Sequence, residues 1–206
     1  MVKNIVLDFG HGGLDENGRY TTHGKMHKFN AKEIAYEGVL NRQIGGVLQS
    51  YLRSLGPEYN IITTVNADDS RDLSLSYRVK VANKYKASET IFVSIHSNAA
   101  GGRGKGFELY TTRGVTKSDA LAESIANEIE PFYKSLELKL RYDTRDGDKD
   151  KEVDFYVLRK TNCPAVLLEC LFFDNYEEFK LLRDPEFQKE LAWRIYQGIV
   201  KHIQNN

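Results

Sequence analysis

Two histidines in this chain each follow closely on an apolar run. His11 comes one glycine after residues 4–9 (Asn-Ile-Val-Leu-Asp-Phe), and His96 follows residues 89–95 (Glu-Thr-Ile-Phe-Val-Ser-Ile). Two imidazoles with one carboxylate form a zinc set that leaves a coordination position open for water. Zinc can lower the pKa of that water to about 7. The residue types therefore suit metal-assisted hydrolysis, provided that carboxylates stand in the right places.

Glu37 is the first such carboxylate. Its steps to Leu40 and Ile44 are three and four residues, so it shares their stripe on a predicted helix. A carboxylate facing a core is costly unless a cation neutralises it. The alternative is a carboxylate at the edge of the stripe that reaches solvent or an arginine. Glu33, one turn earlier, is a rival ligand, although the helix dipole alone explains an acid in a first turn.

Glu169 is the second carboxylate, and it lies inside the apolar run 165–173 (Ala-Val-Leu-Leu-Glu-Cys-Leu-Phe-Phe). Poor solvation there should raise its pKa, and a general base works best with a pKa near the operating pH. We expect Glu169 to take a proton from water and to pass it to a leaving amine, while zinc polarises the scissile carbonyl. The alternative is a strand-end glutamate that points away from the sheet.

Each histidine is a weak signal when taken alone. The glycines around His11 could cradle a phosphate, but the turn has neither the spacing and lysine of a P-loop nor the GxGxxG pattern. A lone histidine at a strand end, such as His96, is ordinarily structural. His23 and His27 lie in a polar loop and suit the surface, and His202 suits the dipole of a last helical turn.

Strands and helices that alternate along the chain must position these groups. Strands are predicted at 4–9, 60–65, 89–95, 107–111, 153–159 and 165–170, and helices at 33–55, 72–86, 117–135 and 184–203. This order implies an α/β fold with a largely parallel sheet covered by helices on both faces. The sequence shows no repeat, low-complexity tract or linker, so we expect one domain over residues 1–206.

The predicted topology brings the chemistry to one edge of the sheet. Ligands of open α/β sheets bind beyond the carboxyl ends of the strands. His11 and His96 follow predicted strands, and Glu169 lies near the end of the last one. If these strands are parallel neighbours, the three groups converge. The charged residues 139–152 are predicted to form an exposed loop that could line the site.

The bulk composition excludes several classes of protein. The 206 residues carry a formal net charge of zero, which is unlike the basic footprint of a nucleic-acid binder. No stretch approaches the ~20 apolar residues of a membrane span, and the short apolar run at the N-terminus does not form a signal-peptide core. Cys163 and Cys170 are expected to be reduced core thiols.

Four short motifs, in this order, resemble those of the zinc-dependent N-acetylmuramoyl-L-alanine amidases, often called amidase type 3. Residues 8–13 read Asp-Phe-Gly-His-Gly-Gly, and 36–38 with 41–42 read Tyr-Glu-Gly and Asn-Arg. Residues 94–98 read Ser-Ile-His-Ser-Asn, and 164–169 read Pro-Ala-Val-Leu-Leu-Glu. The likeness covers almost the whole chain.

The resemblance implies roles for the residues singled out above. His11, Glu37 and His96 match the family's zinc ligands, which chooses Glu37 over Glu33, and Glu169 matches its catalytic glutamate. It also implies a twisted, six-stranded, mostly parallel sheet surrounded by helices. The implied reaction is hydrolysis of the amide between N-acetylmuramic acid and L-alanine in peptidoglycan.

Further residues fit the family without a defined role. Arg78 and the dipeptide 82–83 (Ala-Asn) match a helix of the family. We expect Asp8, Asn98 and His23 to contact substrate or to support the metal ligands.

The chain also departs from the family pattern. Phe9 stands where proline is usual, and residues 170–172 read Cys-Leu-Phe where the family has a glycine before the phenylalanine, which affects the shape of the substrate groove. The loop 22–25 is similar to that of phage-encoded members. With no export signal, the pattern favours a phage endolysin made in the cytoplasm that reaches the wall through a holin-type pore. No wall-binding repeat follows, so the enzyme has a single domain or a binding module was removed.

Two other functions remain open at this point. A zinc peptidase that cuts within the stem peptide would use the same metal chemistry. A non-catalytic peptidoglycan-binding module would keep the site as a relic.

Overall fold

The computed structural model describes residues 1–143, 145 and 147–205, and its centre is a six-stranded sheet in the order β4-β1-β5-β8-β6-β7. The strands are β1 (Asn4–Phe9), β4 (Asn60–Thr63), β5 (Thr90–Asn98), β6 (Glu108–Thr111), β7 (Lys151–Glu152) and β8 (Ala165–Phe172). All neighbours are parallel except β6 and β8, which are antiparallel. The predicted six-stranded, mostly parallel sheet is confirmed.

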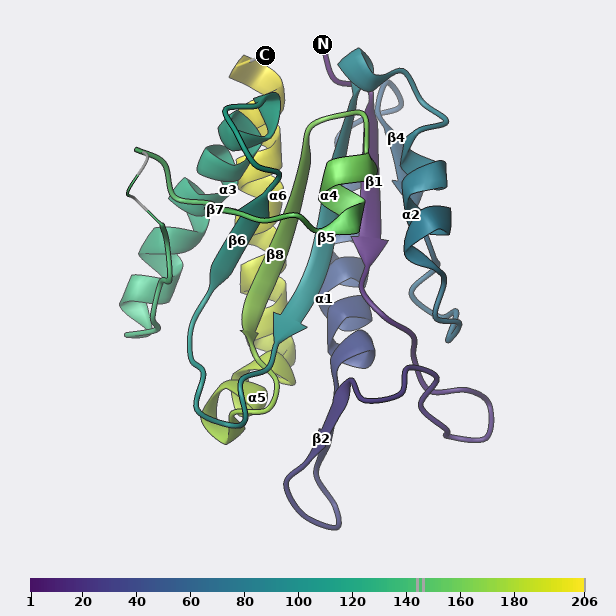
Figure 1. Cartoon of the computed structure of the whole chain (residues 1–206), viewed down its shortest axis with the longest axis vertical. Coiled ribbons are helices and arrows are strands. Elements are labelled where there is room, and N and C mark those ends of the chain that lie inside the picture. The colour runs from purple at the N-terminus through teal and green to yellow at the C-terminus, as the bar shows by residue number, and fades with distance from the viewer. Residues whose placement is uncertain (144, 146, 206) are drawn as a thin grey trace.

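Helices lie on both faces of this sheet (Figure 1). They are α1 (Glu37–Leu52), α2 (Leu75–Ala82), α3 (Lys117–Ser135), α4 (Tyr156–Lys160), α5 (Tyr176–Leu182) and α6 (Pro185–Asn205), with a 3-10 turn η1 (Ala87–Glu89). The arrowheads of β1, β5 and β8 all point to the end of the molecule opposite the two termini (Figure 1). The carboxyl ends of the three strands therefore meet at one edge, as predicted.

One face of the sheet is packed by the three long helices. Because side chains alternate along a strand, every second residue points to this face. In β8 these residues are Val166, Leu168 and Cys170, and they belong to one apolar cluster with residues of α1, α3 and α6 such as Ile44, Ile125 and Ile195. We call this the helical face. It holds most of the buried apolar side chains.

The other face is covered only in part, by the short helices α2 and α4. Its strand residues Val6, Phe92 and Leu167 pack against Val79 of α2 and Val157 of α4 in a smaller cluster. The next residues on the same face toward the carboxyl ends are polar. We call this the site face, and its uncovered part lies beside the strand ends.

The long predicted helix 33–55 begins four residues later than expected. Residues Ile34–Tyr36 form β3, which pairs with β2 (Met26–Lys28) as an antiparallel hairpin. Asn30 turns this hairpin, because its Oδ1 accepts hydrogen bonds from the backbone N–H groups of Lys32 and Glu33. The pairing replaces the first turn of helix, so Glu37 opens α1.

The predicted strand 153–159 is wrong. Val153, Phe155 and Val157 alternate as strand residues do, but the structure has β7 at Lys151–Glu152 and then α4 from Tyr156. The predicted loop 139–152 therefore ends in a strand, and its Asp150 is buried. Helix α5 was not predicted.

Two further expectations concern the cysteines and the membrane. Cys163 and Cys170 are free and buried, and burial raises the pKa of Cys163 to about 12. Among the described residues, the helices are all too short or too polar to cross a membrane.

Candidate metal and catalytic site

The turn after β1 holds His11 in an unusual backbone conformation. The φ of His11 is 63°, in the left-handed region that costs a non-glycine residue energy unless its surroundings hold it there. Gly10 has to be glycine, because a Cβ there would lie 2.3 Å from the imidazole of His96. The turn therefore brings the backbone of β1 directly against the second histidine.

Two arginines hold this turn by its carbonyl oxygens. Arg78 donates from Nη1 to Phe9 O at 2.6 Å and from Nη2 to His11 O at 3.2 Å. Arg42 donates from Nη1 to Gly12 O at 2.9 Å. Both guanidinium groups are largely buried, so the strained backbone at His11 is fixed from two sides.

Asp8 fixes Arg78 in turn. Its Oδ1 lies 2.7 Å from Arg78 Nη1 and its Oδ2 accepts from Ser94 Oγ at 2.7 Å. Burial would raise the pKa of Asp8, but the charge of Arg78 and the hydrogen bonds from Thr64 and Ser94 outweigh it and lower the pKa. Asp8 thus stays ionised on the site face and supports the His11 turn through Arg78.

Glu37 reaches the same place from the first residue of α1. The helix packs closely on the turn, since a Cβ on Gly38 would lie 1.9 Å from Gly12 O. Asn41, one turn on, donates from Nδ2 to Gly10 O at 3.2 Å. The Glu37 side chain is buried, and its Oε2 has no hydrogen-bond partner among the described residues.

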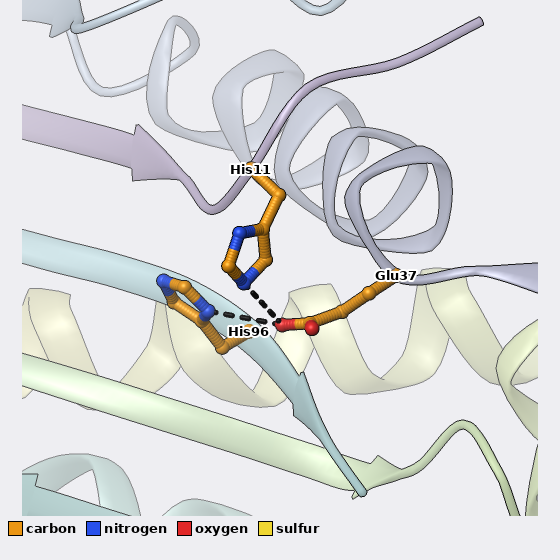
Figure 2. Close-up of side chains that lie close together, drawn as sticks. All are labelled: His11, Glu37 and His96. Atoms are coloured by element: carbon orange, nitrogen blue, oxygen red, sulfur yellow. Dashed lines mark hydrogen bonds and ion pairs between the residues drawn. The ribbon is translucent and has the colours of Figure 1, made fainter. Parts of the chain in front are cut away.

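His11, Glu37 and His96 converge on one point (Figure 2). Glu37 Oε1 lies 3.1 Å from His11 Nε2 and 3.0 Å from His96 Nδ1. One ligand atom of each residue lies within 4.8 Å of the others. Two neutral imidazole nitrogens and a carboxylate oxygen make a donor set that suits zinc. Glu37 Oε2 accepts no hydrogen bond from the described residues and faces only the ammonium of Lys25 at 3.6 Å, so the carboxylate keeps capacity for a cation. The residues present fit the metal predicted from the sequence.

The electrostatics of the cluster also favour a cation. Burial would raise the pKa of Glu37, but its contacts with His11 and His96 outweigh burial and lower it far below the ordinary value. Burial would lower the pKa of His96, but the hydrogen bond and charge of Glu37 raise it. Positive charge beside Glu37, on protons or on a metal, is therefore strongly stabilised.

Glu169 lies beside this cluster on the site face. In the β5–β8 register it is paired with His96, and it alternates with Ala165 and Leu167, which face α4. Burial raises the pKa of Glu169 to about 8, and its Oε2 has no hydrogen-bond partner among the described residues. A neighbouring cation would lower this pKa toward neutrality.

A cavity of about 230 Å³ opens onto these groups. Its lining includes His11, His96 and Glu169, with Lys25 from the β2 side and an apolar wall formed by Leu75, Phe155, Tyr156 and Val157. Lys25 Nζ lies 3.6 Å from Glu37 Oε2. Substrate can therefore reach the metal candidates and Glu169 from one pocket.

The other predicted residues lie at different distances from this pocket. Asn98 is on the site face and donates to Glu108. His23 is exposed in a turn and does not line the cavity. The rival ligand Glu33 lies outside the cluster, where it pairs with Arg183 and accepts from Tyr176.

Several residues of the site were not singled out from the sequence. Lys25 stands in the loop where His23 was preferred. Glu108 is paired with Glu169 in the sheet, and it contacts Arg141 and Lys151, which come from segments far apart in the chain. The alternation of Glu108 with apolar Phe107 and Leu109 is the one signal that could have placed Glu108 on a polar face.

Comparisons with known proteins agree with the fold and the motifs. The family model described as N-acetylmuramoyl-L-alanine amidase matches residues 5–201. The endolysin of Bacillus phage SPP1 is 31% identical over 98% of this chain and 66% of its own length. The N-acetylmuramoyl-L-alanine amidase CwlM of Bacillus licheniformis is 31% identical over 98% of this chain and 68% of its own. The chain thus spans about two thirds of these relatives.

A solved structure shows the same fold. The crystal structure of an N-acetylmuramoyl-L-alanine amidase from Clostridium difficile 630 superposes with a TM-score of 0.79 at 27% identity, covering 100% of this chain and 98% of that one.

Proposed function

The chain belongs to the N-acetylmuramoyl-L-alanine amidase family, and from this premise we propose that it hydrolyses the amide between N-acetylmuramic acid and L-alanine in peptidoglycan with zinc as its cofactor. His11, Glu37 and His96 hold the metal, and Glu169 is the catalytic base. The observation that carries the proposal is the convergence of two imidazole nitrogens on Glu37 Oε1 beside a buried carboxylate.

Zinc, when bound, polarises the scissile carbonyl and lowers the pKa of the attacking water. Glu169 accepts a proton from that water and delivers it to the leaving amide nitrogen of L-alanine. Its position supports this role, because it is paired with His96 in the sheet and lines the same cavity. Burial keeps its pKa high, which suits a group that must gain and then release a proton.

The remaining residues of the site hold these groups in place. Arg78 and Arg42 fix the turn that carries His11, and Asp8 fixes Arg78. Lys25 faces the cavity beside Glu37 and is free to contact the substrate carbonyl or the sugar. Asn98 and His23 keep their predicted roles in substrate contact or ligand support as proposals.

Mass spectrometry of digested peptidoglycan tests the bond specificity. The zinc-loaded protein should release stem peptides that begin with L-alanine and leave intact glycan strands. Cleavage within the stem peptide would favour a zinc peptidase instead. Binding to the wall without release of any fragment would favour a non-catalytic module.

We further propose an endolysin role with residues 1–206 as a catalytic domain. The relative from Bacillus phage SPP1 is named an endolysin, which supports the expectation from loop 22–25. Made in the cytoplasm, the protein would act on the wall after release. Lysis of whole cells from outside and from inside, with and without a membrane-permeabilising partner, tests this role.

A further inference from the structure

Glu108 is a buried carboxylate directly beside the catalytic candidate. It is 3% exposed and is paired with Glu169 in the antiparallel β6–β8 register. Directly opposite residues of such a pair point to the same face, with Cβ atoms about 5 Å apart. Glu108 therefore lies on the site face, one strand beyond Glu169.

Four side chains satisfy Glu108, and two of them are cations. Arg141 Nε and Lys151 Nζ each lie 2.6 Å from its Oε1. Asn98 Nδ2 and Tyr110 OH donate to its Oε2. Burial would raise the pKa of Glu108, but the hydrogen bonds from Lys151 and Arg141 outweigh it and lower the pKa. One carboxylate thus stands against two positive charges.

Arg141 and Lys151 keep exposed surface beyond their contact with Glu108. Arg141 is 34% exposed and Lys151 is 27% exposed. Arg141 engages Glu108 through Nε, and its Nη1 and Nη2 make no hydrogen bond within the described part of the chain. The guanidinium also lies 5.5 Å from the ring centroid of Phe172. A guanidinium held by one edge presents the geometry that binds a second carboxylate in a bidentate manner.

We propose that Arg141 and Lys151 bind a free carboxylate of the stem peptide, with Glu108 as the positioning residue that holds both cations. This inference rests on the proposed function. The carboxyl of N-acetylmuramic acid is consumed in the scissile amide, so every free carboxylate of the substrate lies on the peptide side. The cations therefore orient the peptide across β6 and β7, with the sugar on the other side of Glu169.

The spacing agrees with this orientation. Neighbouring strands lie roughly 4.8 Å apart, and an extended peptide advances roughly 3.3 Å per residue. Glu108 lies one strand beyond Glu169, and Arg141 Nε and Lys151 Nζ each lie 2.6 Å from Glu108 Oε1. A carboxylate one or two residues past L-alanine reaches them while the scissile amide lies beside Glu169.

Two synthetic ligands test the inference, namely N-acetylmuramoyl-L-alanyl-D-glutamate and its diamide, which lacks free carboxylates. Their dissociation constants are measured by calorimetry with the zinc-loaded Glu169→Gln protein, so that turnover does not interfere. The carboxylate compound should bind about 10- to 100-fold more tightly, the size expected for a hydrogen bond to a charged group. Equal affinity for the two compounds would overturn the proposal without any further variant.

Substitutions then assign the preference to these side chains. When Arg141→Met is added to the Glu169→Gln protein, the ratio of the two dissociation constants should fall to near unity. Arg141→Lys should keep part of this ratio. The matched control is Arg194→Met, because Arg194 is 33% exposed and pairs with Glu190 on α6, behind the helical face. A preference that survives both Arg141→Met and Lys151→Met contradicts the proposal.

Cleavage is scored separately with the unsubstituted enzyme. If neither compound is cut, the proposed amidase activity fails, while the difference in binding still decides the carboxylate site.

Discussion

The two faces of the sheet differ in how they are packed and in the side chains that they carry. The helical face receives Val166, Leu168 and Cys170 from β8 and buries them under three long helices. The site face receives Ala165, Leu167 and Glu169 from the same strand, and only two short helices cover it. One strand with period-two alternation therefore contributes to a core on one side and to the cavity of the candidate site on the other.

The comparison shows where charged side chains can be buried at a low cost in folding free energy. On the site face, each buried charge has an opposite partner, such as Asp8 with Arg78 or Glu108 with Lys151. Glu169 is the exception, because its raised pKa of about 8 reflects burial without a cationic hydrogen-bond partner. Substitutions on the two faces should therefore fail in different ways, and neighbours in β8 provide the sharpest test.

Glu169→Gln should give the largest effect on function. Loss of a general base lowers kcat by about 10²- to 10⁴-fold, whereas the isosteric amide keeps the packing of the site face. The melting temperature should shift by no more than about 4 °C, which corresponds to about 1 kcal/mol in a domain of this size. Peptidoglycan release and a thermal melt measure the two effects, and an active variant refutes the role of Glu169 as base.

Asp8→Asn should give the largest loss of stability on the site face. Removing one partner of a buried ion pair leaves Arg78 uncompensated and costs about 3–5 kcal/mol. The folded pKa of Asp8 is lowered, so its contribution is present above the ordinary value of 3.8 and is lost as pH falls through the folded pKa. Urea unfolding at pH 7 and in the acid range measures both. Equal stability of the variant and the parent at pH 7 contradicts the pairing.

Leu168→Ala tests the helical face one residue away from Glu169. The side chain is fully buried, and its truncation should cost about 2–5 kcal/mol of unfolding free energy. The folded fraction should keep its metal and its kcat, because the side chain points away from the site. A variant that folds stably but loses activity would show that the two faces are not independent.

Asp150→Asn should give the smallest effect. It should raise the unfolding free energy, whereas Asp8→Asn and Leu168→Ala lower it. Burial raises the pKa of Asp150 to about 6. A carboxyl whose folded pKa is raised contributes stability that is full below the unfolded value of 3.8 and is lost as pH rises through about 6. The amide should therefore stabilise the protein by about 1 kcal/mol at pH 7.5 and not at pH 4. Unfolding free energies at the two pH values decide this.

The sequence predicted the sheet and the convergence of the candidate metal ligands, because strand and helix patterns and short motifs are local. The run 4–9 and the amphipathic stretch 117–135 became β1 and α3 with those boundaries. Strand ends pointed to His11 and His96 and a helical stripe to Glu37, the resemblance to the amidase family chose Glu37 over Glu33, and the structure brings the three together.

The failures all involve contacts that lie outside the element whose pattern was read. Residues 34–36 form a strand because β2 pairs with them. The helical stripe that starts at residue 33 does not predict this pairing. Residues 153–159 alternate like a strand, yet the chain turns over the site face and forms α4. Glu108 meets Lys151 through the pairing of β6 with β7, Arg141 through the bridge between Phe107 and Leu140, and Glu169 through the pairing of β6 with β8, so this link was not visible in the sequence.

The central claim is that the site face holds a catalytic zinc ion. Bound metal and wall lysis should be measured together on the parent protein and on His96→Ala, with Leu168→Ala as the control from the helical face. The account predicts about one zinc per chain and cleared peptidoglycan for the parent and the control, and the loss of both for His96→Ala. A parent protein that binds no zinc, and that cuts no wall after zinc is supplied, would contradict it.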